Sequence, residues 1–277
     1  MFNYFLHSIV LIFLGYASVY PILFWVTPSE KIETGFYRFN LGKCCIVGFL
    51  GALAYHFIST DVLTDILIWI WIFSLMIATG FYWKKNKVHN TVLSLISVFG
   101  IYSLLNIIFY MVESDLFLIS MFAVMIGSLI TSAVFFSMIL GHWYLNVVAL
   151  PISLLRSSII VLTAWLLLRT IWDIVYLSIT QYVNVYGIAK NSWLFLLDFD
   201  GLLLLVALFM GNIFPIIINY FVWKTLEVQA TQSATGLVYV SIISILFGDI
   251  IFKYYLLQYG IPPVSYTHLT LPTKVEV

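Results

Sequence analysis

The chain has 277 residues, of which 63% are hydrophobic and only 9% are charged, and its formal net charge is zero. An average soluble domain has about 25% charged residues, so this composition excludes a soluble globular protein and predicts an integral protein of the lipid bilayer. No basic block suggests nucleic acid as a partner. A membrane-protein partner or a homo-oligomer remains open.

Eight segments are apolar enough to cross a bilayer, which takes about 20 mostly apolar residues in a helix. Polar stretches such as TDVLTD, KKNKVHN and VESD separate them. The sequence therefore predicts an all-α fold, a polytopic transmembrane helix bundle of eight spans. We place the spans at 4–26, 41–60, 66–83, 92–111, 116–140, 157–179, 200–223 and 236–259.

The loops between these spans alternate in charge. Cytoplasmic loops carry an excess of Lys and Arg, so we expect the basic, odd-numbered loops in the cytoplasm. The N-terminus and the C-terminal end of the fragment then lie on the outer side. The absence of an organellar targeting pattern favours a bacterial cytoplasmic membrane. The basic residues are Lys31, Arg38, Lys43, Lys84, Lys85, Lys87, Arg156 and Lys224; the even-numbered loops hold Asp61, Asp65, Glu113, Asp115 and Lys190.

Two histidines lie at matching depth in the first two spans. His7 and His56 both fall just inside the predicted outer ends. If the two helices are antiparallel neighbours, paired imidazoles could ligate haem b or a metal ion. Hydrogen-bonded histidines near the membrane interface are the more ordinary interpretation. We therefore expect no cofactor, and keep haem b at His7 and His56 as the alternative.

The sixth span contains an intramembrane ion pair. Arg169 lies about 18 Å along the helix from the predicted inner end, near the middle of the bilayer. Asp173 follows four residues later, on the same face, although Arg before Asp is the weaker order for such a pair. Before this span, Pro151 and Arg156 suggest a short interfacial segment, unless the span begins earlier.

The seventh span combines polar residues with a helix breaker. Asp200 lies at its outer end and could form an acidic vestibule for a cation, although acids at a helix start are common. Further along, Asn212 and Asn219 flank Pro215, which cannot donate a hydrogen bond to the carbonyl of Gly211. Broken helices of this kind line the binding sites of transporters.

The eighth span contains a second intramembrane carboxylate. Asp249 lies near the middle of the span, and Lys253 follows it by four residues. Charges within spans are costly and usually face the bundle interior, so each indicates a functional site by default. One interpretation is a structural network in which Asp173 or Asp249 neutralises Arg169. The other is a pathway for a solute or proton.

The last residues differ from the rest of the chain. The ten residues 264–273, VSYTHLTLPT, match a translation of the common transposase sequencing adapter without a mismatch. We therefore expect one membrane domain over 1–263 with its native C-terminus missing, and interpret 264–277 as an artefact to be left out of fold reasoning.

No motif of a characterised enzyme is present. The chain has no nucleotide-binding glycine loop, no H-E-x-x-H and no G-x-S-x-G. The leading hypothesis is a small-solute or proton-linked transporter whose site is formed by Arg169, Asp173 and Asp249 beside the break at Pro215. The alternatives are a redox subunit that binds haem b or quinone near the outer face, and an anchor or assembly factor without chemistry of its own.

Overall fold

The computed structural model describes residues 2–28, 30–85, 87–112, 116–147, 150–183 and 189–259. The segment 264–277 lies outside the described residues, as do Glu113 and Asp115. The described elements, in chain order, are α1 (Phe2–Val19), the 3-10 helix η1 (Tyr20–Val26), α2 (Thr34–Ile58), α3 (Val62–Tyr82), α4 (Asn90–Met111), α5 (Phe117–Asn146), α6 (Ile152–Ile179), β1 (Gln181–Val183), β2 (Ala189–Asn191), α7 (Ser192–Phe195), α8 (Leu202–Leu208), the π-helix η3 (Phe209–Ile213), α9 (Phe214–Glu227) and α10 (Thr231–Tyr259).

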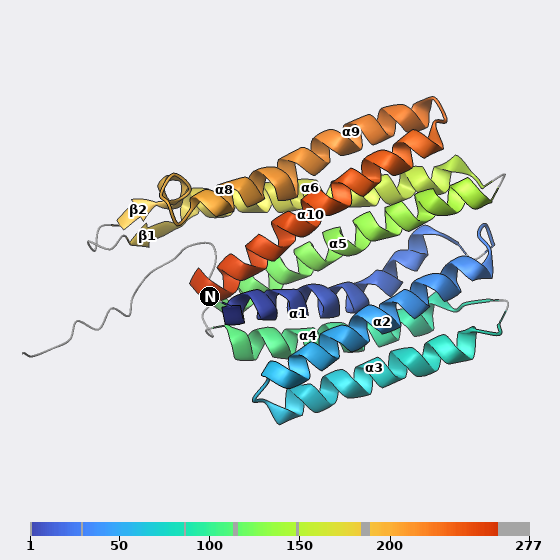
Figure 1. Cartoon of the computed structure of the whole chain (residues 1–277), viewed down its shortest axis with the longest axis horizontal. Helices are drawn as coiled ribbons and strands as arrows, with labels where there is room; N and C mark the ends of the chain where they lie inside the picture. The colour runs from blue at the N-terminus through green and yellow to red at the C-terminus, as the bar shows by residue number, and fades with distance from the viewer. Residues whose placement is uncertain are drawn as a thin grey trace, which may run out of the picture.

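The prediction of an all-α bundle is confirmed. Within the described residues, eight helices are long and apolar enough to cross a membrane, and they run alternately up and down the bundle (Figure 1). α8, η3 and α9 together form the seventh span, Leu202–Glu227. The described strands are the short antiparallel pair β1 and β2. The chain is therefore an integral, multi-pass membrane protein.

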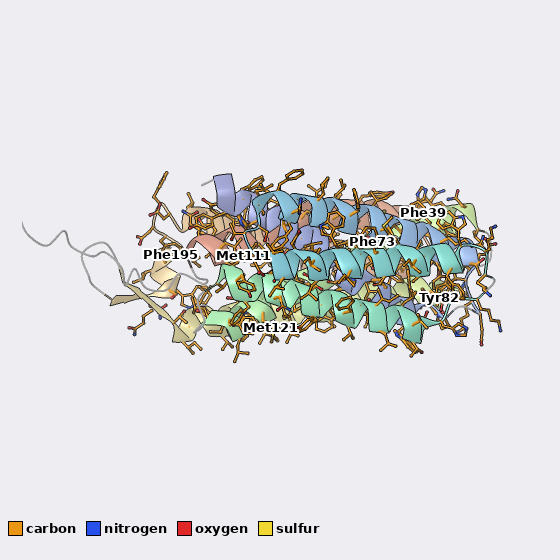
Figure 2. The ribbon with its side chains drawn as sticks, turned by 90° about the horizontal axis from the view of Figure 1, so that it is seen from below. Phe39, Phe73, Tyr82, Met111, Met121 and Phe195 are labelled. Carbon is orange, nitrogen blue, oxygen red and sulfur yellow. The ribbon has the colours of Figure 1, made fainter. Side chains whose placement is uncertain are left out.

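The sides of the bundle are covered by apolar side chains, as a lipid environment requires. Phe73 projects from α3 midway between Tyr82 at one end and Met111 at the other (Figure 2). Phe57 and Ile77 leave 77% and 73% of their surface exposed. A soluble protein rarely exposes so many large apolar side chains, whereas here lipid tails can cover them.

The two ends of the bundle differ in charge. We call one the basic end, because the loops after η1, α3, α5 and α9 meet there. The other is the hairpin end, where β1, β2 and both ends of the described chain lie (Figure 1). Which end faces the cytoplasm stays a prediction from the positive-inside rule. The basic end contains Lys31, Arg38, Lys84, Lys85, Lys87, Arg156 and Lys224.

Several helices begin earlier than the sequence predicts. α2 begins at Thr34, so its first turns include polar residues that look like part of a loop, and Lys43 lies inside the helix. α10 begins at Thr231. α6 starts directly after Pro151, which leaves no separate interfacial segment before it. Proline is well tolerated at a helix start, since the amide hydrogen it lacks would have no intrahelical partner there.

α1 and α10 lie at the centre of the bundle. α1 packs against α2, α4, α5 and α10. At Gly51 of α2, a side chain would meet Leu14 of α1 at 2.9 Å, so glycine allows the two helices to approach closely. α10 packs against α5, α1 and the three segments of the seventh span. This position brings α10 within reach of the charged residues on α6.

Candidate intramembrane charge site

Two ion pairs lie inside the bundle, each within one helix. On α6, Arg169 Nε lies 3.1 Å from Asp173 Oδ2, and on α10, Lys253 Nζ lies 2.5 Å from Asp249 Oδ1. The Lys253 and Asp249 side chains are 3% and 5% exposed. Arg169 and Asp249 each lie about 15 Å from the end of their helix at the hairpin end. The two pairs are therefore at similar depth, near the middle of the bundle.

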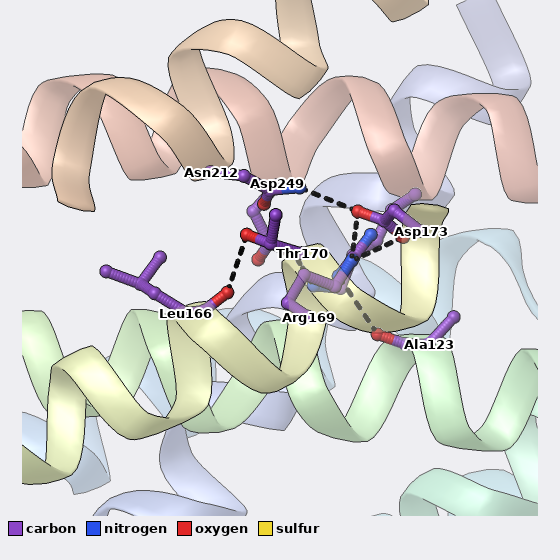
Figure 3. A network of polar contacts seen from close by, with 8 residues as sticks. Ala123, Leu166, Arg169, Thr170, Asp173, Asn212 and Asp249 are labelled. Carbon is purple, nitrogen blue, oxygen red and sulfur yellow. Dashed lines mark hydrogen bonds and ion pairs between the residues drawn. The ribbon is translucent and has the colours of Figure 1, made fainter. Parts of the chain in front are cut away.

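Arg169 connects three helices. Its Nε donates to both carboxylate oxygens of Asp173, and its Nη1 donates to the carbonyl of Ala123 on α5 at 3.4 Å (Figure 3). Its Cζ lies 4.1 Å from the ring centroid of Phe252 on α10, a favourable position for a cation. Of the two expected partners, the structure therefore pairs Arg169 with Asp173, whereas Asp249 takes Lys253.

Residues of α5 complete the surroundings of Asp249. Thr131 Oγ1 donates to Asp249 Oδ2 at 3.0 Å. At Gly127, one turn earlier, an added side chain would collide with the carboxylate and approach Lys253 Nζ. Sequence reasoning missed both residues, although glycine and threonine four apart on an apolar helix indicate a small, partly polar face.

Asn212 brings the seventh span into the site. Its Nδ2 donates to Asp173 Oδ2 at 2.7 Å (Figure 3). Asn212 lies in the π turn η3, which comes directly before Pro215. A π turn accommodates a residue without a normal helical hydrogen bond, and such turns occur often at functional sites. The predicted break is thus present, as a π turn.

The π turn is fastened to α10. The hydroxyl of Ser244 donates to the carbonyl of Met210, one of the acceptors that the irregular helix leaves open. Gly211 lies against Gly248, and a side chain on either glycine would meet the backbone of the other. These contacts hold Asn212, and through it Asp173, in a fixed position relative to the pair on α10.

Two small cavities adjoin the ion pairs. One, of about 10 Å³, is lined by Arg169, Asn212 and Asp249. The other, of about 30 Å³, is lined by Arg169, Asp173 and Phe252. A cavity of about 10–15 Å³ can hold one water molecule if polar groups surround it. Each cavity thus has room for a single water molecule, with charged groups in an otherwise mostly apolar wall, and the first one joins the two pairs.

Asn219 and Asp200, also predicted to belong to the site, lie elsewhere. Asn219 Nδ2 donates to Thr163 Oγ1 at 3.1 Å, which links α9 to α6 about two turns from Asn212. Asp200 is exposed in the turn before α8, where its carbonyl accepts a hydrogen bond from Tyr255. Neither side chain takes part in the described contacts of the two ion pairs.

His56, one of the two histidines of the haem hypothesis, contacts residues of α3. His56 Nδ1 lies 2.8 Å from Asp65 Oδ2, and its ring packs against Trp69, so it faces α3. The face of α2 that packs on α1 contains Gly51, and Tyr55 one turn further on. Within the described ranges, no group of three His, Cys, Asp or Glu residues could hold a metal ion. Haem ligation by His7 and His56 stays a prediction.

Lys43 is a buried charge that sequence reasoning counted with the first loop, at the very start of the predicted span 41–60. Its Nζ lies 4.3 Å from the ring centroid of Tyr20, with Tyr16 and Phe135 also around it. Among the described residues, this ammonium has no hydrogen-bond partner. The aromatic rings stabilise it by cation–π interactions in place of a carboxylate. The burial of Lys43 could not be predicted, because the polar residues that begin α2 made Lys43 look close to the membrane surface.

Comparison of the chain with protein-family models, with curated proteins and with solved structures found no match.

Proposed function

We propose that this membrane protein is a small-solute transporter whose cycle is linked to protons, with Arg169, Asp173 and Asp249 at its centre. The observation that supports this most is the meeting of two separate ion pairs, on α6 and α10, beside a cavity that Arg169 and Asp249 line together. Each pair is neutral as a whole. Such an arrangement can take up or exchange one charge without leaving several charges uncompensated in the membrane.

The cost of burying these groups also favours function over a purely structural role. Well-packed apolar side chains usually stabilise a protein interior at least as well as a buried ion pair does. Charged residues within membrane spans commonly mark ion, proton or substrate pathways. Here four charged side chains lie on two helices, α6 and α10, that meet through the contact of Arg169 with Phe252. The amide of Asn212 and the hydroxyl of Thr131 bind the two carboxylates.

The geometry suggests how a proton could be linked to movement. If Asp173 takes up a proton, Arg169 loses the negative charge of its partner and can turn toward Asp249 across the small cavity that both line. Asn212 also binds Asp173, so the exchange changes a contact of the π turn. This turn packs on α10, where Gly211 meets Gly248. We therefore propose that the seventh span and α10 shift against each other.

Proton uptake in proteoliposomes that contain a trapped pH-sensitive dye tests this function. We expect a transported solute to cause proton uptake in the wild type, and the Arg169→Gln and Asp249→Asn variants to lose it. The matched control is Lys224→Gln with Glu227→Gln, because that ion pair is exposed at the basic end. Solute-dependent uptake that persists in the combined Arg169→Gln, Asp249→Asn variant would show that the site is wrong.

We also propose that the protein resides in a bacterial cytoplasmic membrane with its basic end in the cytoplasm, following the positive-inside rule. Single cysteines at exposed positions of the two ends test this orientation. Glu30→Cys should react with a membrane-impermeant maleimide only in inside-out vesicles, and Thr60→Cys only in right-side-out vesicles. The reverse pattern would contradict the orientation.

A further inference from the structure

A groove of about 590 Å³ lies beside the charge site, between α6, α7 and the first half of the seventh span. Its rim includes Ile174, Val206 and Phe209, which are between 41% and 50% exposed on the side of the bundle. The groove therefore opens toward the lipid. It extends from Trp193 at the hairpin end to Asn212 and Asp173, and Asp173 lies about 9 Å from the end of α6.

Two polar side chains on the floor of this groove, Thr170 and Asp173, present hydrogen-bond acceptors. Thr170 uses its hydroxyl proton on the carbonyl of Leu166 at 2.8 Å, so its oxygen presents lone pairs. Asp173 accepts two hydrogen bonds from Arg169 and one from Asn212. An ionised carboxylate offers about four acceptor sites, so Asp173 can accept one more. Its side chain is 13% exposed.

The charge balance of the floor restricts the head group that would bind. Arg169 already neutralises Asp173, and it does so from the side of Ala123 and Phe252 without lining the groove. A second cation would therefore be uncompensated in an apolar setting, and an anion would lie beside the carboxylate of Asp173. A neutral hydrogen-bond donor fits both conditions.

We propose that the groove binds a neutral apolar compound with a hydroxyl head, taken laterally from the leaflet at the hairpin end. The hydroxyl donates to Asp173 or Thr170, and the apolar body lies along the groove toward Trp193. The role of this compound as the transported substrate rests on the function proposed above, whereas the binding itself does not.

Quenching of Trp193 by brominated probes in lipid nanodiscs tests the binding. The probes are para-bromophenylpropanol, its methyl ether and the corresponding amine, which share one body and differ in their heads. Trp193→Phe identifies the signal from the groove. We expect saturable quenching by the alcohol and binding of the ether at least about tenfold weaker, because the ether cannot donate to the carboxylate. Equal binding of the ether, or tighter binding of the amine, would overturn the proposal.

Two variants test the floor of the groove. Asp173→Asn should weaken binding of the alcohol about tenfold or more, and Thr170→Val should weaken it several-fold without removing a charge. The matched control is Thr235→Val, since the Thr235 hydroxyl makes the same kind of bond to a helix carbonyl, that of Thr231 on α10, but lies outside the groove. Alcohol binding that is unchanged in both floor variants would also overturn the proposal. Alcohol binding without solute-dependent proton uptake would contradict only the transport function. Solute-dependent proton uptake without alcohol binding would contradict only the proposed groove.

Discussion

Replacement of Arg169 by methionine measures what the ion pair on α6 contributes to stability. The variant loses two hydrogen bonds to Asp173, one to Ala123 and the contact with the ring of Phe252. It leaves a buried carboxylate with Asn212 as its remaining described donor. Removal of one partner of a buried pair costs about 3–5 kcal/mol, so we expect the free energy of unfolding to fall by that amount.

The combined variant Arg169→Met, Asp173→Asn is the matched control for this experiment. It removes both charges, and the new asparagine can still accept a hydrogen bond from Asn212. Because neutral replacements of buried pairs are often tolerated, its free energy of unfolding should lie within about 2 kcal/mol of the wild type. Equilibrium unfolding in mixed micelles, followed by circular dichroism, measures both variants. A single variant as stable as the wild type, or a double variant as unstable as the single one, would refute the reasoning.

Three further variants test other contacts by their thermal unfolding midpoints. Gly248→Val places a side chain against the backbone of Gly211 and should lower the free energy of unfolding by about 1–3 kcal/mol or more. The control is Gly236→Val on the same helix, which meets open space and should cost little. Equal effects of the two variants would contradict the close contact between the helices. Lys43→Met removes an ammonium that has no carboxylate partner, so its effect on stability should be neutral or favourable. A large drop in the unfolding midpoint would contradict our account of Lys43 and the aromatic rings around it. Ser244→Ala removes one hydrogen bond to the π turn and should cost about 0.6–1.7 kcal/mol; no change would show that the bond is weak.

The spans could be predicted because bilayer thickness imposes a length and a composition that stand out in a sequence. The residues at which the helices begin were harder to predict from the sequence. Thr34 and Thr231 begin helices inside polar stretches, since a helix can extend beyond the hydrocarbon core into the interface, where hydropathy gives no signal. Pro151 suggested an interruption, but proline at a helix start is also a normal beginning.

The candidate site was only partly accessible from the sequence. Arg169, Asp173 and Asp249 stood out because charge is rare within apolar segments, and Asn212 because it lies next to a helix break. The pairing depends on helix rotation and register, so neither the link from Asn212 to Asp173 nor the contribution of Thr131 could be derived. The same limit explains why Asn219, two turns from Asn212, was expected near the cluster and instead contacts Thr163.

The most direct test of the central claim is proton uptake by the combined Arg169→Met, Asp173→Asn variant in proteoliposomes. This variant keeps the π turn and the pair on α10 but lacks the charged pair that α6 contributes to the site. The account predicts a folded protein, with an unfolding midpoint close to that of the wild type, that shows no solute-dependent proton uptake. Wild-type uptake in this variant would contradict the account and leave the ion pair a structural link between helices.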